Sequence, residues 1–307
     1  MKIPIPPCPV CRRHQASAIH HTPFDALNAY WSGVGINLTG DYPEFKGGIR
    51  RYHCRHCGTG FFVPSTSGAP SLYDALSKHD WYYEAARWEH SRILGILERN
   101  GIQRCLEVGC GDGGFLVQIA EICPSTRGIE TNPRGNAACL RRGLDVTTAL
   151  LDSFPANSQD AIVLVQVLEH IQDTVAFVQE AKRCLRPSGL LIVSVPNEDG
   201  VLGLQTRNYL NMPPHHVTLL RKSSFNHLAA EHGFTIESYE TQNITFPQYL
   251  SYYDELASAA LGFSGSLGKV ARHVGLLLSR AVSPLAFETA KHRHAGHTHL
   301  AVLRNIA

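Results

Sequence analysis

From residue 104 onward, short apolar segments alternate with stretches of helical periodicity, and this constrains the fold more than any other feature of the chain. The expected strands are 104–108, 126–130, 145–148, 160–166 and 190–195, and the helical stretches between them are 114–122, 133–142 and 174–185. Such alternation predicts a parallel sheet with helices on both faces, because each parallel connection has to cross the sheet. Ligands of these sheets bind at the carboxyl ends of the strands, where the strand order reverses.

Two further strands are expected near the C-terminus, at 235–241 and 299–304, with a long insertion between them. Residues 246–294 have apolar residues at helical spacing, which predicts a helical lid or an oligomer contact that determines acceptor specificity. The histidines of the tail segment 292–299 are irregularly spaced among polar residues, so we expect a solvated surface loop there.

The composition is that of a folded chain. Of the 307 residues, 44% are hydrophobic, which is enough to build a core. The 28 basic and 26 acidic side chains give a net charge of +2, which argues against nucleic acid as the main partner. No apolar run approaches the roughly 20 residues that span a bilayer, and no secretion signal is recognisable, so we expect a cytoplasmic protein.

Four of the nine cysteines form two C-x-x-C pairs, Cys8/Cys11 and Cys54/Cys57. Two such loops complete a tetrahedral thiolate site for one Zn²⁺, and a closed site of this kind is structural. Gly58 suits the tight turn after the second pair because glycine adopts positive φ. The alternative is two chance pairs of reduced thiols. The nearby histidines are expected at the surface, and the other five cysteines are expected to be small buried hydrophobes.

These patterns divide the chain into four parts. Residues 1–66 form the zinc-binding segment, with short strands at 50–53 and 59–63, and residues 67–103 form a helical linker. The main domain comprises 104–245 and 295–307, and 246–294 is the helical insertion.

The loop after the first main strand fits two kinds of cofactor. Gly109, Gly111 and Gly114 match the dinucleotide fingerprint, in which a pyrophosphate approaches a helix N-terminus. Glu107 with Gly109, Gly111 and Gly113 instead fits a loop that holds S-adenosylmethionine (SAM). Glu130, at the end of the second strand, suits a ribose in both cases. The strand pair expected at the C-terminus is unusual for a dinucleotide domain and favours SAM.

Taken in order, the segments 105–116, 160–173 and 183–197 resemble class I SAM-dependent methyltransferases. With the four-cysteine segment ahead of it, the chain is similar to bacterial methyltransferases of sugar, polysaccharide and natural-product pathways. The resemblance implies a seven-stranded, mostly parallel, doubly wound Rossmann-like sheet, with a small zinc-ribbon-like unit before it. It also implies methyl transfer to a small-molecule or glycan acceptor, on oxygen or carbon.

The resemblance also implies which residues contact SAM. The residues placed around its methionine half are Glu107, Gly109, Cys110, Gly111, Gly113 and Gln166. Glu130 is placed at the ribose, and Thr131, Asp152 and Ser153 flank the adenine.

A histidine near neutral pH is a natural base for removing a proton from the acceptor. His216, in the segment 213–218 before a helix expected near Ser223, matches the position of the proposed base in the related sugar methyltransferases. Pro213 and His215 stand where those enzymes have tyrosine and glutamate, which leaves O-methylation as open as C-methylation. In an extended loop, His215 and His216 would point to opposite sides. His170, after Glu169, is the second candidate, in a role that shapes the site.

Two alternatives remain open on sequence grounds. One is a zinc-bearing RNA methyltransferase, against which the first segment offers arginines but no stacking platform. The other is a SAM-fold partner protein that binds without catalysing. The oligomeric state is left open.

Overall fold

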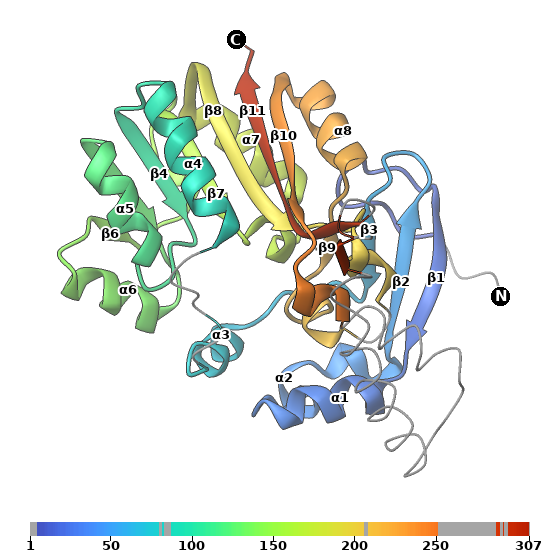
Figure 1. Cartoon of the computed structure of the whole chain (residues 1–307). Coiled ribbons are helices and arrows are strands. Elements are labelled where there is room, and N and C mark those ends of the chain that lie inside the picture. The colour runs from blue at the N-terminus through green and yellow to red at the C-terminus, as the bar shows by residue number, and fades with distance from the viewer. Residues whose placement is uncertain are drawn as a thin grey trace. The chain divides into compact units, whose positions relative to one another are not determined.

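The computed structural model describes residues 5–79, 82, 87–205, 208–250, 287–288, 291 and 294–306 (Figure 1). Most of the insertion expected at 246–294 lies outside these residues. The described residues divide between two compact units. The first comprises Met1–Val195, Tyr209–Tyr239 and Leu300–Ala307, and the second comprises Pro196–Asn208 and Glu240–His299. The finer four-part division of the chain stays a prediction.

The main sheet has seven strands in the order β10-β11-β8-β7-β4-β5-β6. Their bounds are β4 Arg104–Val108, β5 Ser125–Ile129, β6 Val146–Thr147, β7 Gln159–Val165, β8 Leu185–Pro196, β10 Phe234–Asn243 and β11 Ala295–Asn305. The pairs β4/β5, β5/β6, β4/β7 and β7/β8 are parallel, and Figure 1 shows β11 running opposite to β8. The predicted seven-stranded, mostly parallel, Rossmann-like fold is therefore confirmed.

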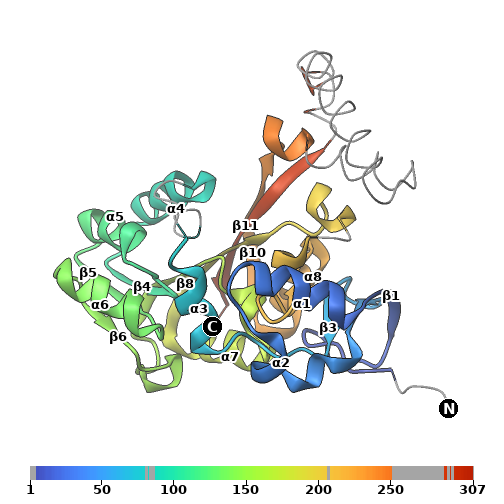
Figure 2. The same ribbon diagram turned by 90° about the horizontal axis from the view of Figure 1, so that it is seen from below.

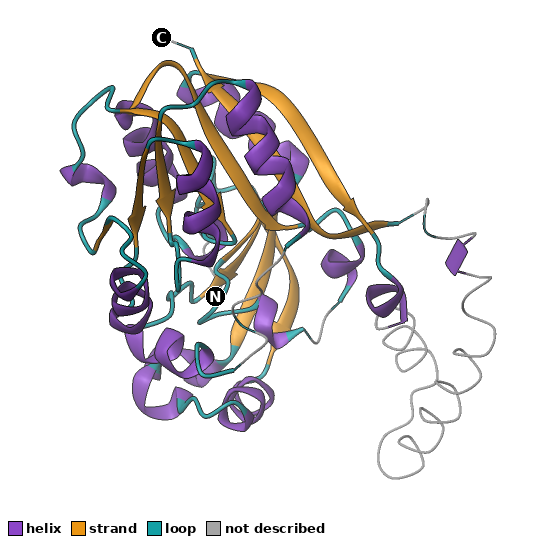
Figure 3. Ribbon diagram, turned by 60° about the vertical axis from the view of Figure 1, so that its left-hand side comes forward, coloured by secondary structure: helices purple, strands orange, loops and turns teal. Residues whose placement is uncertain are grey.

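Helices cover both faces of this sheet (Figure 3). They are α4 Trp88–Arg99, α5 Gly114–Ile122, α6 Pro133–Arg141, α7 Thr174–Cys184 and α8 Lys222–His232. Successive strand residues face opposite sides, so Cys105 packs with α4 and α5 in one cluster, whereas Leu106 packs with α7 and α8 in another. The view in Figure 2 shows α5 and α6 beside β5 and β6.

Local capping explains where two of these helices begin. The Asn132 side chain accepts hydrogen bonds from the amides of Arg134 and Gly135 at the start of α6. The Asp173 side chain accepts one from Ala176 at the start of α7. Each cap satisfies backbone amides that have no partner within the helix.

A second sheet of four strands has the order β1-β2-β3-β9. Its strands are β1 Ala16–Thr22, β2 Ile49–Cys54, β3 Gly60–Val63 and β9 Thr218–Leu219, and the helices beside them are α1 Phe24–Gly33, α2 Leu38–Asp41, η1 Pro43–Gly47 and α3 Pro70–Leu76. The predicted strands at 50–53 and 59–63 correspond to β2 and β3. Because β9 pairs antiparallel with β3, with Phe61 opposite Thr218, the N-terminal segment adjoins the loop that follows β8.

Short 3-10 helices occupy several connections, at η2 Leu151–Ser153, η3 Leu168–His170, η4 Val201–Leu204 and η5 Tyr209–Asn211. η3 begins three residues after the last residue of β7 and therefore lies at the carboxyl end of the sheet.

The expectation of a solvated loop at 292–299 is wrong for its described part. His297 and His299 belong to β11, and His299 is fully buried. Burial lowers the pKa of both imidazoles, to about 4 for His297 and about 3 for His299. In this segment the carbonyl of His297 accepts a hydrogen bond from the amide of Asn197, just after β8, at 2.7 Å. Within the described residues, no helix has the length and apolar character required to cross a bilayer.

Candidate functional site

The glycine-rich loop lies at the carboxyl end of β4, where the strand order reverses between β4 and β7. Gly109, Gly111 and Gly113 have φ values of +73°, +57° and +82°, a region that side chains rarely adopt. A Cβ on Gly109 would come within 2.5 Å of Val167 Cγ2, and one on Gly113 within 2.5 Å of Leu144 Cδ1. The loop therefore requires glycine for its conformation and for its close packing.

Glu130 holds this loop from the neighbouring strand. Its Oε2 accepts a hydrogen bond from the amide of Gly111 at 2.7 Å, and its Oε1 accepts one from the amide of Asn132 at 2.6 Å. Burial raises the pKa of Glu130, although the backbone hydrogen bonds oppose that effect. The carboxyl group is thus fixed beside the loop.

Glu107 lies beneath the loop and is 3% exposed. Its Oε2 has no hydrogen-bond partner among the described residues. Burial, with added repulsion from Glu130 and Asp112, raises the pKa of Glu107 to about 8. An unpartnered buried carboxyl oxygen is costly, so this position suits a hydrogen-bonding or cationic ligand group.

Gln166 follows β7 with a φ of +56°, which is uncommon for a residue with a side chain. Its Nε2 donates to Glu89 Oε1 at 3.3 Å and lies 3.2 Å from Ser194 Oγ, which itself donates to Glu89 Oε1 at 3.1 Å. Glu89, on α4, is a buried acid that sequence reasoning missed, because only the fold brings it to the end of β7. Strained backbone at such a position often accompanies a binding site.

The other residues expected around the cofactor occupy different environments. Cys110 is buried, and its Sγ lies 3.8 Å from Cys139 Sγ. Thr131, Asp152 and Ser153 are exposed, and the last two belong to η2. These three are therefore free to border a ligand without being part of the core.

Three histidines meet beyond the end of β7. One ring nitrogen from each of His170, His215 and His216 lies within 4.8 Å of the other two. The rings of His215 and His216 stack at 4.4 Å with 20° between their planes, and His170 meets His215 edge-on at 4.5 Å. The two candidate catalytic histidines thus belong to one cluster.

The expectation that His215 and His216 point apart is wrong, because the loop turns where extended backbone was assumed. The amides of both residues donate to the carbonyl of Met212, at 3.0 and 3.1 Å. His215 Nδ1 then lies 2.9 Å from the carbonyl oxygen of Leu210, and His216 Nδ1 lies 2.7 Å from Asn211 Oδ1. Both rings therefore present their Nε2 atoms on the side away from residues 210–211.

His215 and His216 are buried and His170 is half-buried, and these surroundings favour uncharged imidazoles. Burial lowers the pKa of His215 and His216 well below the ordinary value of 6.5. Burial also lowers the pKa of His170 to about 4, although backbone hydrogen bonds to His215 and Gln166 favour its charged form. Neutral imidazole has a free nitrogen lone pair, which is the form that accepts a proton or binds a cation.

Aromatic side chains surround His215. Trp31 of α1, Tyr73 of α3 and Tyr82 lie with ring centroids 6.4, 6.3 and 6.0 Å from its ring. Trp31 comes from the N-terminal segment, which sequence reasoning had assigned a structural role alone. No local pattern around Trp31 indicates this neighbour, because the contact depends on the pairing of β3 with β9.

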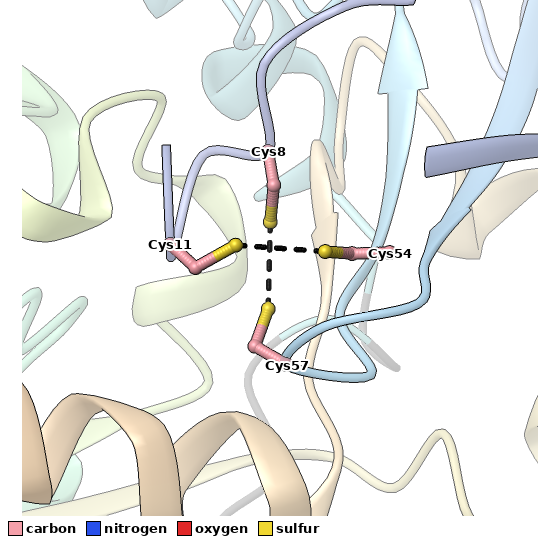
Figure 4. A group of neighbouring side chains, drawn as sticks. All are labelled: Cys8, Cys11, Cys54 and Cys57. Atoms are coloured by element: carbon pink, nitrogen blue, oxygen red, sulfur yellow. Dashed lines mark hydrogen bonds between the residues drawn. The ribbon is translucent and has the colours of Figure 1, made fainter. Parts of the chain in front are cut away.

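The four cysteines of the first segment converge as the spacing predicts (Figure 4). Cys8 Sγ lies 3.5 Å from Cys57 Sγ, Cys11 Sγ lies 3.5 Å from Cys54 Sγ, and all four sulfurs lie within 4.8 Å of one another. Zn–S bonds of about 2.3 Å in a tetrahedron place sulfurs roughly 3.8 Å apart, so the group fits one Zn²⁺. All four are free thiols, and the hydrogen bond from Cys8 lowers the pKa of Cys57 to about 4.

The surroundings of the tetrad also match expectation in part. Gly58 has a φ of +77°, as the turn requires, and His14 and His56 are exposed. The tetrad connects to α8, because Cys57 Sγ donates to Thr59 Oγ1 at 3.2 Å and that hydroxyl donates to Ser224 Oγ at 2.8 Å.

Fold and site together define the class of the protein. A model described as a methyltransferase domain matches residues 77–239, just over half of the chain. The chain therefore belongs to the methyltransferase domain family, as the sequence resemblance predicts.

Relatives agree with this membership. The chain is 30% identical over 136 residues to a "Probable S-adenosylmethionine-dependent methyltransferase" of Mycolicibacterium smegmatis, covering 43% of this chain and 52% of the relative. It is 38% identical over 96 residues to a protein of the same description from Mycobacterium tuberculosis, covering 30% and 35% of the two chains. The chain thus spans about half or less of the curated relatives that it matches.

A solved structure shows the same fold. It is phosphoethanolamine N-methyltransferase 2 of Haemonchus contortus in complex with S-adenosyl-L-methionine, with a TM-score of 0.50 and 18% identity, covering 76% of this chain and 57% of that chain. At this identity the likeness concerns the fold alone.

Proposed function

We propose that this protein transfers a methyl group from SAM to a small-molecule or glycan acceptor, on oxygen or carbon. The observation that carries the proposal is the position of the histidine cluster directly beyond the glycine loop. Gly109 packs against Val167, and the carbonyl of Val167 accepts a hydrogen bond from the amide of His170 at 3.0 Å. These contacts bring the glycine loop next to the histidine cluster, which supports a cofactor and an acceptor bound at the same end of the sheet.

The cofactor half of the site follows from the loop. Gly109, Gly111 and Gly113 allow the methionine half of SAM to approach the backbone, with Cys110 between the first two. Glu107, which has an unpartnered carboxyl oxygen, faces the amino group, and Gln166 lies below the methionine half. Glu130 accepts the ribose hydroxyls with its remaining lone pairs, since each carboxylate oxygen accepts more than one hydrogen bond. Thr131, Asp152 and Ser153 border the adenine.

The acceptor half consists of the histidine cluster and its aromatic surroundings. SAM supplies a methyl group on a sulfonium, which an acceptor atom displaces in line. We assign loss of the acceptor proton to the cluster, with His216 and His170 as its catalytic members. Their neutral imidazoles have the free lone pair that this role needs. Trp31 and Tyr73 restrict the space beside His215 and favour a small acceptor.

The cysteine tetrad has a structural part in this proposal. Cys8, Cys11, Cys54 and Cys57 would hold one Zn²⁺ in a closed shell with no position for substrate. The ion would fix β2 and β3, and through the pairing with β9 it would fix the segment that carries His215 and His216. The zinc would therefore act on catalysis only by positioning.

The test is transfer of labelled methyl from SAM by the purified full chain, with sugar nucleotides and free glycans as acceptors and with tRNA in parallel. We expect a labelled carbohydrate product and formation of S-adenosylhomocysteine that depends on the acceptor. Labelling of tRNA alone would refute the acceptor class. SAM binding without turnover on every acceptor would favour the non-catalytic alternative.

A further inference from the structure

His215 and His216 are buried, His170 is half-buried, and one ring nitrogen of each of the three lies within 4.8 Å of the other two. The Nδ1 atoms of His215 and His216 lie 2.9 and 2.7 Å from oxygen acceptors, and that of His170 lies 2.5 Å from the carbonyl oxygen of His215. An oxygen acceptor requires a proton on each Nδ1, which leaves the lone pair of a neutral imidazole on Nε2. His215 Nε2 is buried and has no partner among the described residues.

Glu169 adds a carboxyl group in the same condition. It is 1% exposed, and neither of its carboxyl oxygens has a hydrogen-bond partner in the described part of the chain. Its Oε1 lies 3.9 Å from His216 Nε2. Buried carboxyl oxygens and imidazole nitrogens without partners are energetically unfavourable. A cation close to them would interact favourably with the oxygens and with the nitrogen lone pairs.

We propose that His170, His215 and His216 bind a divalent transition-metal cation of the zinc type, at a second site distinct from the four-thiolate site. Three imidazoles with an open fourth position are a recurrent ligand set for Zn²⁺ that contacts substrate. The oxygen acceptors on Nδ1 are the outer partners that orient metal-binding imidazoles. A tetrahedral site with Zn–N bonds of about 2.1 Å places nitrogens about 3.4 Å apart, and one ring nitrogen of each histidine lies within 4.8 Å of the other two.

The borderline character of imidazole favours this class of ion over Mg²⁺ or Ca²⁺, which prefer oxygen ligands. Glu169 would supply the nearest negative charge, from just outside the three-nitrogen set. The backbone carbonyl of Gln166 also interacts with the His170 ring. This interaction competes with a metal ion for the ring of His170. Replacing His170 should therefore weaken the site less than replacing His215 or His216.

This inference rests on the proposed function and specifies how the cluster assists it. A cation held there would orient and polarise an acceptor oxygen next to the glycine loop. His216 and His170 would then act as ligands of the ion, and the acceptor proton would pass to the carboxylate of Glu169, whose Oε1 lies 3.9 Å from His216 Nε2.

The experiment measures metal content of the full chain after saturation with Zn²⁺ and removal of weakly bound ion. We expect two equivalents for wild type, and one for His215→Ala and for His216→Ala. His56→Ala, which changes an exposed histidine, is the matched control and should retain two. The one equivalent of zinc that the His215→Ala and His216→Ala proteins retain shows that the cysteine tetrad, and hence the N-terminal segment, is folded.

A second measurement does not depend on variants. Wild type loaded with Co²⁺ should show d–d bands of nitrogen-ligated cobalt in addition to the thiolate charge-transfer bands of the tetrad. One equivalent of zinc in wild type, or thiolate-type cobalt alone, would refute the site. Retention of two equivalents by both cluster variants would refute it equally. If the chain holds one ion and transfers methyl groups, this inference is overturned and the proposed function stands. If the chain holds two ions and transfers no methyl group, the proposed function is overturned and the second metal site stands.

Discussion

Replacing Glu130 by alanine should weaken SAM binding much more than the loss of its internal hydrogen bonds requires. In the structure each carboxyl oxygen accepts one backbone amide, at 2.7 Å from Gly111 and 2.6 Å from Asn132. Each oxygen retains a lone pair, and we assign those to the ribose hydroxyls. A hydrogen bond to a charged acceptor contributes about 1.5–3 kcal/mol, so we expect a loss of roughly 2–3 kcal/mol in binding. That corresponds to a roughly 30- to 150-fold higher dissociation constant for SAM.

The assay is calorimetric titration of SAM, paired with denaturant unfolding of the same preparations. Glu130→Gln retains the size and one acceptor oxygen, so its dissociation constant should lie between those of wild type and Glu130→Ala. Asp160→Ala is the matched control, because Asp160 Oδ2 also accepts two backbone amides, from Gln103 at 3.1 Å and Arg104 at 2.9 Å. Those bonds lie at the start of β4, so this variant should lose stability without losing SAM affinity.

One result would refute the reasoning. If Glu130→Ala lost stability as Asp160→Ala does but bound SAM like wild type, Glu130 would be an anchor of the loop and nothing more. The cofactor would then lie elsewhere along the ends of the strands.

Three further predictions concern the other groups of the site. Cys54→Ser should abolish zinc binding at the tetrad by metal analysis and lower turnover through β9, while SAM affinity stays within about twofold of wild type; an equal loss of SAM affinity would contradict this. Glu107 has a folded pKa of about 8 against an ordinary 4.5, so between these values only the folded chain retains the proton, and the unfolding free energy without SAM should fall as pH rises. The fall is at most about 1.4 kcal/mol per pH unit, and it should be missing in Glu107→Gln, so parallel pH profiles of the two proteins would contradict it. His216→Ala should reduce turnover roughly a hundredfold or more with SAM affinity nearly intact, and turnover near that of wild type would remove His216 from catalysis.

The sequence was most informative where structure is decided locally. The C-x-x-C pairs converge as predicted because each pair forms within one short turn, and Gly58 provides the positive φ that the second turn needs. The glycine loop and Glu130 lie side by side for a similar reason. Both follow directly from the ends of β4 and β5, which are adjacent parallel strands.

Where distant segments meet, the sequence was less informative. Nothing local to α4 predicts that Glu89 accepts hydrogen bonds from Gln166 and Ser194, because these residues are distant from it in the sequence. The stacking of His215 on His216 likewise depends on a turn at Met212, and extended backbone was assumed there. The burial of His299 in β11 is a property of the strand ladder, although its polar neighbours suggested a loop.

The sequence by itself therefore determined the class of fold, the thiolate tetrad and the glycine loop, because apolar periodicity and turn chemistry act over a few residues. The tertiary structure alone decided that Trp31 lies beside His215 and that three histidines with Glu169 form one cluster. Those contacts depend on β9 pairing with β3, between segments more than a hundred residues apart in the chain. Long-range pairing of this kind is fixed by the burial of whole faces against one another, and no short pattern of residues encodes it.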